Sequence, residues 1–348
     1  MKTKAAILYQ VNRPFVIEKI IVPELKTGQV LVDIAYSGIC GSQINEIKGL
    51  KGEDKFLPHT LGHEGSGTVE AVGPGVKKVK RNNKVVLTWI KGNGIDAGSS
   101  IYEKEDGSKI NSGPISTFMT KAVISENRVV KIPNEMPLRE AALLGCAIPT
   151  GSGIILNTIK LSRGDTIAIF GMGGIGLSAL IAAKLKQASI IIAVDVVNSK
   201  LDHALQLGAT HAINAKKEDV LPKIYEITKK LGVDYAIECA GKKESMEIAF
   251  KSVSEKSGRC IIAGNLSYGQ TVQIDPFDLI KGKCIAGTWG GETDTDRDIP
   301  IYVDLAISGK LDLSRLICRV YGLNDINKAI EYMEQRAISR VLVKMDKQ

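Results

Sequence analysis

The chain has 348 residues, of which 44% are hydrophobic and 24% charged. A chain of this length exceeds one ordinary hydrophobic core, so we expect two domains, and the composition argues against disorder. The formal charge is +8, but the basic residues are scattered and aromatic residues make up only 5% of the chain. We therefore expect no nucleic-acid partner, since single strands are bound by stacked aromatic and clustered basic side chains.

The first nine residues carry charge and lack the apolar segment and cleavage site of a signal peptide. The most apolar stretch, 166–185, is about long enough to span a bilayer, but glycines interrupt its start, which favours a strand followed by a helix. The six cysteines are widely spaced, which is typical of a reducing compartment. We expect a cytoplasmic protein with no membrane partner.

The chain begins with short β-rich runs separated by turn residues, at 6–9, 15–17, 30–34, 67–72, 84–87 and 128–132. They predict a β-rich domain, in which 91–113, rich in Gly, Ser, Asn and Asp, is a long surface loop. From about Thr150, apolar runs alternate with amphipathic helical stretches. This pattern predicts an α/β domain with a parallel sheet covered on both faces. After Gly287 the pattern is mixed and ends in a helix and a strand.

A GxGxxG motif follows the first apolar run: Gly171-Met172-Gly173-Gly174-Ile175-Gly176. It lies between a predicted strand and a predicted helix, which is the context of a dinucleotide site. Gly171 would permit a tight turn, Gly173 would let the backbone approach a pyrophosphate, and Gly176 would let the helix pack closely on the strand. The phosphates would then lie at the positive end of the helix.

An acidic residue, Asp195, ends the next apolar run about 20 residues beyond the motif. A carboxylate at this place binds the ribose hydroxyls of NAD and repels the extra phosphate of NADP. The alternative is a flexible glycine turn with an incidental Asp. The agreement of strand, glycines, helix and acid favours an NAD site in a Rossmann, doubly wound parallel sheet.

Three separate segments each contain a candidate zinc ligand: Cys40 in GICGS, His63 in LGHEG and Cys146 in LGCA. Two thiolates and one imidazole would leave a fourth position open, as a catalytic zinc requires. Spacing alone does not bring these segments together, and a buried thiol is the ordinary alternative for each cysteine. From the residues alone, both interpretations stay open.

In this order, the segments GICGS, LGHEGSGTVEAVG, the one around Cys146, and GMGGIG resemble the zinc-containing medium-chain alcohol dehydrogenases over nearly the whole chain. The resemblance implies that Cys40, His63 and Cys146 bind the catalytic zinc. Glu64 matches a glutamate that approaches the metal and exchanges with its water, or that only supports the ligands. The implied architecture is a β-rich, GroES-like catalytic domain and a Rossmann domain, over 1–148 with 289–348 and over 149–288.

The same resemblance assigns roles to single positions. They are Ser42 on the path of the substrate proton, Thr150 beside the nicotinamide, Lys200 near the adenosine ribose, Arg340 on the pyrophosphate and Trp89 in the substrate pocket. For Lys200 and Arg340, a solvated surface charge is the alternative.

One segment and two single positions depart from the family pattern. The four cysteines of the structural zinc lobe would fall in 91–113, which contains none, so we expect one catalytic zinc per chain and no structural zinc. Asn45 replaces the histidine that often ends the proton relay, and it cannot carry a proton. Gln43 replaces an aspartate that supports the zinc-bound histidine, and its amide oxygen could accept the imidazole N–H. The other cysteines, at 239, 260, 284 and 318, are expected to be core thiols.

We expect an enzyme that transfers a hydride between NAD and an alcohol, polyol or sugar, with zinc as Lewis acid. Oxidation of a glutathione–formaldehyde adduct is an alternative, because 287–291 resembles that branch. A zinc-free quinone or enoyl reductase is another alternative, but such enzymes normally lack the Cys–His trio. A non-catalytic binding or structural protein is a further alternative, but it would not need both the GxGxxG motif and the metal ligands. The resemblance also implies a homodimer or homotetramer that associates near 258–263 and 283–289.

Overall fold

The computed structural model describes residues 1–335 and 338–346, and the chain forms two compact units. The first comprises Met1–Cys146 together with Asp294–Gln348, and the second comprises Ala147–Thr293. The sequence-based division lay at 148/149 and 288/289, whereas the units divide at 146/147 and 293/294.

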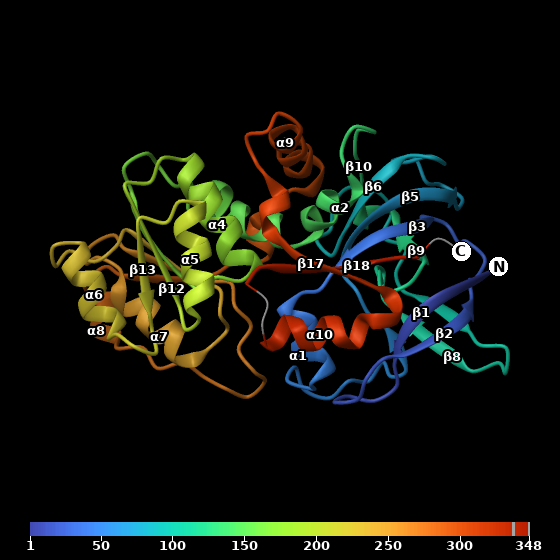
Figure 1. Ribbon diagram of the computed structural model, residues 1–348, viewed down its shortest axis with the longest axis horizontal. Helices are drawn as coiled ribbons and strands as arrows, with labels where there is room; N and C mark the ends of the chain where they lie inside the picture. Colours follow the sequence, from blue (N-terminus) through green and yellow to red (C-terminus); the bar gives the residue numbers. More distant parts are fainter. Residues whose placement is uncertain (336–337, 347–348) are drawn as a thin grey trace. The chain divides into compact units, whose positions relative to one another are not determined.

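The first unit contains a small barrel and a sheet. The barrel strands, in spatial order, are β1 (Lys2–Leu8), β2 (Val16–Ile21), β7 (Ser100–Glu103), β8 (Lys109–Ser112) and β4 (His59–Thr60). The sheet has the order β10 (Val129–Lys131), β6 (Lys84–Thr88), β5 (Glu64–Val72), β3 (Gln29–Gly38), β18 (Arg340–Lys344) and β17 (Ile317–Gly322), and β9 (Lys121–Ser125) also pairs with β3. In Figure 1 the red strand β18, from the end of the chain, lies beside the blue strand β3.

Short helices connect these strands, and one core joins barrel and sheet. The helices are α1 (Gly41–Ile47), η1 (Glu126–Arg128), α2 (Leu138–Ala141), η2 (Ala142–Gly145), α9 (Thr295–Ile307), η5 (Leu313–Leu316), η6 (Leu323–Asp325) and α10 (Ile326–Gln335). Apolar, largely β-branched side chains such as Ile7, Val32 and Val343 pack with Phe118 in the core. Such side chains suit the half-buried surface of a pleated sheet, which explains why these runs form strands.

The expected long loop over 91–113 is partly wrong, because it contains the β7–β8 hairpin. Along Ser100–Glu103 buried and exposed residues alternate, which is the pattern of a half-buried strand. Tyr102 is fully buried, and its hydroxyl accepts the backbone N–H of Val123 (2.7 Å). Gly107, at φ +82°, forms the turn after Asp106. An Asp-Gly pair flanked by alternating residues is a hairpin signal that the composition of the segment concealed.

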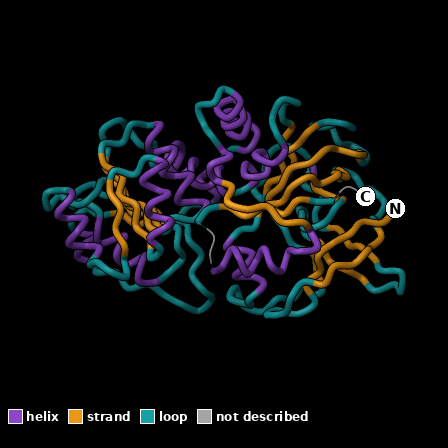
Figure 2. Tube along the Cα trace, in the orientation of Figure 1, coloured by secondary structure: helices purple, strands orange, loops and turns teal. Residues whose placement is uncertain are grey.

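The second unit is a six-stranded parallel sheet. Its order is β13 (His211–Asn214), β12 (Ile190–Asp195), β11 (Thr166–Phe170), β14 (Tyr235–Glu238), β15 (Arg259–Ile262) and β16 (Cys284–Gly287). The helices are α3 (Ala147–Gly153), η3 (Ile154–Thr158), α4 (Gly174–Leu185), α5 (Asn198–Leu207), α6 (Val220–Ile227), α7 (Lys243–Ser252), α8 (Pro276–Ile280) and η4 (Gly290–Glu292). Figure 2 shows helices on both sides of these strands, as the near-continuous apolar runs predicted. The strand order is that of the doubly wound Rossmann fold.

Residues 166–185 form strand β11 and helix α4, which confirms the interpretation of that apolar stretch. In the described part of the chain, no single helix is both long and apolar enough to cross a bilayer.

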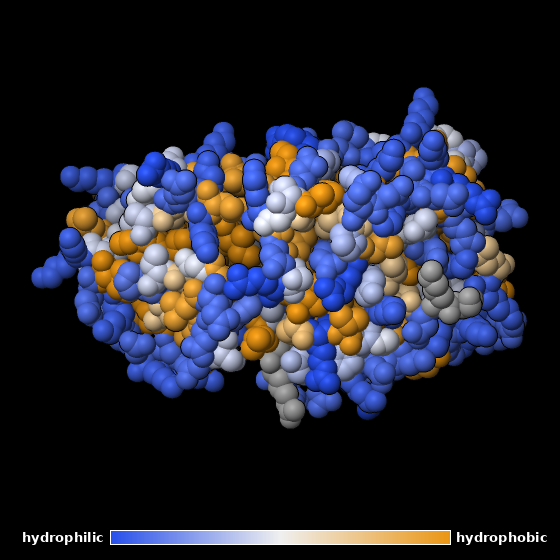
Figure 3. Space-filling model, turned by 45° about the horizontal axis from the view of Figure 1, so that its top comes forward, coloured by the Kyte–Doolittle hydropathy of each residue, from blue (hydrophilic) through white to orange (hydrophobic). Residues whose placement is uncertain are grey.

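The face of the molecule drawn in Figure 3 is mostly hydrophilic, with hydrophobic side chains between the polar ones. The expectation of a core thiol is wrong for Cys284, which is exposed, because it lies on β16, the edge strand of this sheet among the described residues.

Candidate metal and cofactor sites

Four candidate ligands converge in the first unit. A sulfur atom from each of Cys40 and Cys146, a ring nitrogen of His63 and a carboxylate oxygen of Glu64 all lie within 4.8 Å of one another. Cys40 follows β3 and caps α1, His63 and Glu64 stand at the start of β5, and Cys146 follows η2. The two cysteines and Glu64 are buried. The fold thus brings together the three segments that spacing alone could not connect.

Strand pairing explains this convergence. β3 and β5 are antiparallel, with Ser37 opposite Gly65, so the end of one strand lies beside the start of the other. The segment that ends in Cys146 packs closely against β5 at Gly145, where a Cβ atom would lie 2.8 Å from the Cβ of Glu64. A residue with a side chain at this position would push the Cys146 segment away from the other ligands.

The electrostatics of the cluster favour a bound cation. A hydrogen bond from the side chain of Cys146 holds the pKa of the Cys40 thiol well below its usual value, with further lowering by His63 and Arg340 against the opposing effect of burial. The thiolate is the form that binds metals. His63 Nε2 and Glu64 Oε2 are buried without a hydrogen-bond partner. Such orphaned atoms are rare in folded proteins, and this set of donors fits a zinc ion.

Arg340 lies in this cluster, on the other side of Glu64. Its guanidinium donates a hydrogen bond to Glu64 Oε1, and both side chains are buried. Burial lowers the pKa of Arg340, while the neighbouring Cys40 raises it. A solvated surface charge, the alternative for Arg340, is therefore excluded. Its contact with a pyrophosphate stays a prediction.

Gln43 has a different partner from the one expected. Its Oε1 accepts the backbone N–H of Cys40 (3.2 Å), and its Nε2 is buried without a partner. Gln43 is the third residue of α1, and a Gln at this position reaches back to the residue that caps the helix. The prediction that its amide oxygen accepts the N–H of His63 is therefore wrong. Gln43 instead holds the backbone of the candidate ligand Cys40.

Two more predicted residues lie close to the ligands. The ring of Trp89 stands edge-on to the ring of His63, with 6.4 Å between centroids. Ser42 lies in the first turn of α1, two residues after Cys40, and is partly exposed. Asn45 is one helical turn further along and is also partly exposed. The roles of Trp89 and Ser42 stay predictions.

The second unit contains a cavity of about 750 Å³ at the carboxyl ends of its strands. Its lining includes four predicted residues: Gly171, Gly173, Asp195 and Lys200. Gly171 has φ +92°, and a Cβ atom there would lie 2.8 Å from the backbone nitrogen of Ala240. At Gly173, which caps α4, a Cβ atom would project into open space, so its absence leaves room for a phosphate at the helix N-terminus.

Asp195 is held rigidly at the end of β12. Its Oδ2 accepts the backbone N–H of Met172 (2.7 Å), and its Oδ1 accepts those of Val196 and Val197 (2.7 and 3.0 Å). The carboxylate therefore bridges the glycine turn and the turn after β12. Gly174, Ile175 and Gly176 form the first turn of α4.

Thr150 lies in α3, buried, with its Oγ1 unpartnered, and outside the lining of this cavity. Four charged residues that no sequence motif indicated also line the cavity: Glu218, Asp219, Lys242 and Glu244. Nothing in their local sequence distinguishes them from surface residues.

Comparisons with known proteins place the chain in a family. Residues 26–134 match the alcohol dehydrogenase GroES-like domain, and residues 174–308 match the zinc-binding dehydrogenase domain. The chain belongs to the zinc-binding alcohol dehydrogenase family, with a GroES-like catalytic domain and a Rossmann-type domain.

Its relatives include an S-(hydroxymethyl)glutathione dehydrogenase of Paracoccus denitrificans, 32% identical over 96% of this chain and 97% of the relative. Among solved structures, an alcohol dehydrogenase zinc-binding domain protein from Burkholderia ambifaria is 32% identical, with a TM-score of 0.92 and full coverage of both chains. The benzyl alcohol dehydrogenase of Acinetobacter calcoaceticus is 30% identical, with a TM-score of 0.89, and covers 99% of this chain and 100% of its own.

Proposed function

We propose that this protein is an NAD-dependent alcohol dehydrogenase with one catalytic zinc ion held by Cys40, His63 and Cys146. The observation that carries the proposal is the convergence of two buried thiols, one imidazole and one carboxylate within 4.8 Å, with two orphaned acceptor or donor atoms among them. Membership of the zinc-binding alcohol dehydrogenase family supports it. A zinc-free reductase would have no use for this set of ligands.

The reaction converts an alcohol and NAD⁺ into a carbonyl compound, NADH and a proton. Zinc, when bound, would act as a Lewis acid at the substrate oxygen. We assign to Ser42 the acceptance of the hydroxyl proton, because it lies in the same turn of α1 as the ligand Cys40. Asn45, one helical turn further along α1, has no titratable proton and cannot continue the path. NAD, when bound, would supply the acceptor for the hydride of the alcohol carbon.

Zinc and NAD have separate supports in the two units. The lowered pKa of Cys40 favours its thiolate form, and the Arg340–Glu64 pair leaves one Glu64 carboxylate oxygen without a partner, available to the metal or its water. In the second unit, Asp195 would accept the ribose hydroxyls, and Gly173 would leave space for the pyrophosphate. Lys200 lines the same cavity, and we retain Thr150 on the nicotinamide side as a proposal.

A second candidate function is oxidation of S-(hydroxymethyl)glutathione, because relatives with that name are 32–33% identical to this chain. Elemental analysis of the purified protein and a screen of NAD reduction test both. The screen compares primary alcohols, polyols, sugars and S-(hydroxymethyl)glutathione. Protein that holds no zinc and reduces no NAD with any of them would refute the proposal.

We also propose that the chain forms a homodimer or homotetramer through the open edge of β16. Several hydrophobic side chains near this edge are exposed, including Ile280 (78%) and Trp289 (77%). An unpaired edge strand flanked by apolar side chains favours pairing with a second copy. Light scattering coupled to size exclusion would measure the mass, and a monomer at micromolar concentration would refute this.

A further inference from the structure

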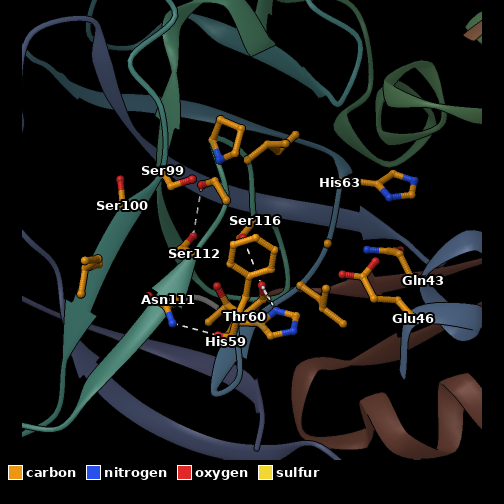
Figure 4. A pocket seen from close by; sticks show the side chains of 17 residues that line it. Gln43, Glu46, His59, Thr60, His63, Ser99, Ser100, Asn111, Ser112 and Ser116 are labelled. Atoms are coloured by element: carbon orange, nitrogen blue, oxygen red, sulfur yellow. Dashed lines mark hydrogen bonds between the residues drawn. The ribbon is translucent and has the colours of Figure 1, made fainter. Parts of the chain in front are cut away.

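A second cavity, of about 500 Å³, lies within the first unit beside the candidate metal ligands. Helix α1, the β7–β8 hairpin and the segment that leads into β5 bound it. Figure 4 shows Gln43, Glu46 and His63 at one side of the view, and Ser99 and Ser112 at the other. Since His63 lines the cavity, a molecule bound there would reach one of the proposed zinc ligands. The volume is within the range of small-molecule sites.

The wall presents free acceptors together with an unpartnered amide nitrogen, Gln43 Nε2, and an unpartnered hydroxyl, Thr60 Oγ1. Glu46 Oε2 accepts a hydrogen bond from Lys51 Nζ (2.9 Å), and its Oε1 accepts none from the described residues. Asn111 donates through Nδ2 to the carbonyl of Phe56 (2.8 Å), and its Oδ1 has no partner in the described part of the chain. A ligand that satisfies a carboxylate and an amide oxygen must itself donate, as hydroxyl groups do.

The wall offers no free positive charge. Among the described residues that line the cavity there is no lysine or arginine. Lys51 is paired with Glu46 from outside the lining. His59 Nε2 is 2.8 Å from an Asp54 oxygen, and its Nδ1 is 3.2 Å from the carbonyl of Thr60, so both ring nitrogens are occupied. A ligand carboxylate would therefore lose its hydration without gaining a free cation as counter-charge, which is costly.

Apolar side chains complete the lining, among them Phe56, Ile101 and Ile115. Hydroxyl groups alternate with C–H groups along a polyol or around a sugar ring. A cavity with both acceptors and apolar side chains thus complements both parts of such a molecule.

We propose that this cavity binds the remote end of an uncharged polyhydroxylated substrate, a polyol or sugar, with Glu46 and Asn111 accepting hydrogen bonds from its hydroxyl groups. The inference rests on the proposed function, because it treats the cavity as part of the substrate site beside His63. It also disfavours S-(hydroxymethyl)glutathione, whose two carboxylates would meet the Glu46 carboxylate and no free cation.

Steady-state kinetics of the zinc-loaded enzyme with NAD test the substrate class. We expect kcat/KM to be higher for a hexitol than for S-(hydroxymethyl)glutathione. Glu46→Gln should lower the hexitol-to-benzyl-alcohol ratio of kcat/KM about tenfold, chiefly through KM, since a charge-assisted hydrogen bond is lost. The matched control is Glu53→Gln, an exposed acid outside the lining, which should not change the ratio. Ser99→Arg, at an exposed lining position, should raise kcat/KM for the glutathione adduct.

Calorimetric titration of the same proteins with the hexitol separates this inference from the proposed function. Binding that weakens in Glu46→Gln and not in Glu53→Gln supports the cavity as a hydroxyl-binding site, even if no alcohol is oxidised. Absence of hexitol binding to the unmutated protein would overturn the inference. Alcohol oxidation with a preference for S-(hydroxymethyl)glutathione, or equal effects of Glu46→Gln and Glu53→Gln, would also overturn it, and would leave the proposed function standing.

Discussion

The guanidinium of Arg340, at the start of β18, donates a hydrogen bond to the carboxylate of Glu64, at the start of β5, although 276 positions separate them. The side chains are 3% and 0% exposed. Gly38 provides the space for this pair, since a Cβ atom there would lie 2.6 Å from Glu64 Cδ and 3.0 Å from the guanidinium. The pair thus places among the candidate zinc ligands a carboxylate, that of Glu64, whose negative charge is balanced by Arg340.

Breaking this pair should destabilise the metal-free protein strongly. Arg340→Met leaves the Glu64 carboxylate buried without its counter-charge, which typically costs about 3–5 kcal/mol. The double variant Glu64→Gln/Arg340→Met should recover part of that loss. Urea denaturation of both proteins with a zinc chelator present measures the free energy of unfolding. Equal losses in the single and double variants would show that the pair is not the cause.

The metal content should be one zinc per chain, bound through Cys40. Cys40→Ala removes one of three protein ligands, so we expect the purified variant to hold little zinc. Cys284→Ala is the matched control, because Cys284 is exposed on β16 and far in sequence from every candidate ligand. Elemental analysis measures the ratio. Two tightly bound zinc ions per chain, or full zinc in Cys40→Ala, would contradict the assignment.

Loss of the Gln43 side chain should weaken zinc binding without abolishing it. Gln43→Ala frees the backbone N–H of Cys40, and loss of such an outer support typically costs about 10–100-fold in metal affinity. Gln43→Glu keeps the acceptor and should retain more affinity. Chelator competition measures the zinc affinity, and hydrogen exchange at the Cys40 amide reports the lost bond. If Gln43→Ala exchanges the Cys40 amide hydrogen faster but binds zinc with unchanged affinity, Gln43 supports the backbone and has no effect on the metal.

Asp195→Asn should narrow the preference for NAD over NADP. The substitution removes the charge that would repel the extra phosphate and keeps an oxygen to accept the backbone N–H groups of Val196 and Val197. Asp195→Ala should narrow it too, but would remove all three backbone contacts, whereas Asp195→Asn loses only the one from Met172, because its Nδ2 is a donor. The kcat/KM ratio for the two cofactors is the measurement. Equal kcat/KM values of the unmutated enzyme for NAD and NADP would refute the role of Asp195 in selecting NAD.

Glu238 should make the stability depend on pH. Burial raises the pKa of Glu238 above its usual value. The folded chain therefore holds this proton more tightly than the unfolded chain. As a result, the free energy of unfolding falls as pH rises from the ordinary carboxyl pKa, about 4.3, through the raised value. Glu238→Gln removes this titration, so relative to the unmutated protein it should gain stability as pH rises through that window.

Urea denaturation at several pH values measures that difference. The control is Glu244→Gln, since Glu244 is exposed on the neighbouring helix α7. A difference between Glu238→Gln and the unmutated protein that does not vary with pH would contradict the prediction.

The local sequence determined the Rossmann unit because its signals are local. The strand, the glycine turn and helix α4 follow within 166–185, and Gly171 adopts the positive φ that the motif requires. Asp195 ends the next strand at the expected place. The composition of 91–113 led to the wrong prediction of a continuous loop. Its many turn residues concealed the alternation of buried and exposed residues in β7 and the hairpin turn at Gly107.

Only the tertiary structure decided what surrounds the candidate metal site. Cys40, His63 and Cys146 meet because β3 pairs with β5 and because Gly145 lets the third segment approach. Arg340 reaches Glu64 because the last strand pairs with β3. Such pairings depend on the register between strands from distant parts of the chain, and no local pattern records that register. The motifs thus predicted which residues to examine, and the packing of the sheet determined that they lie together.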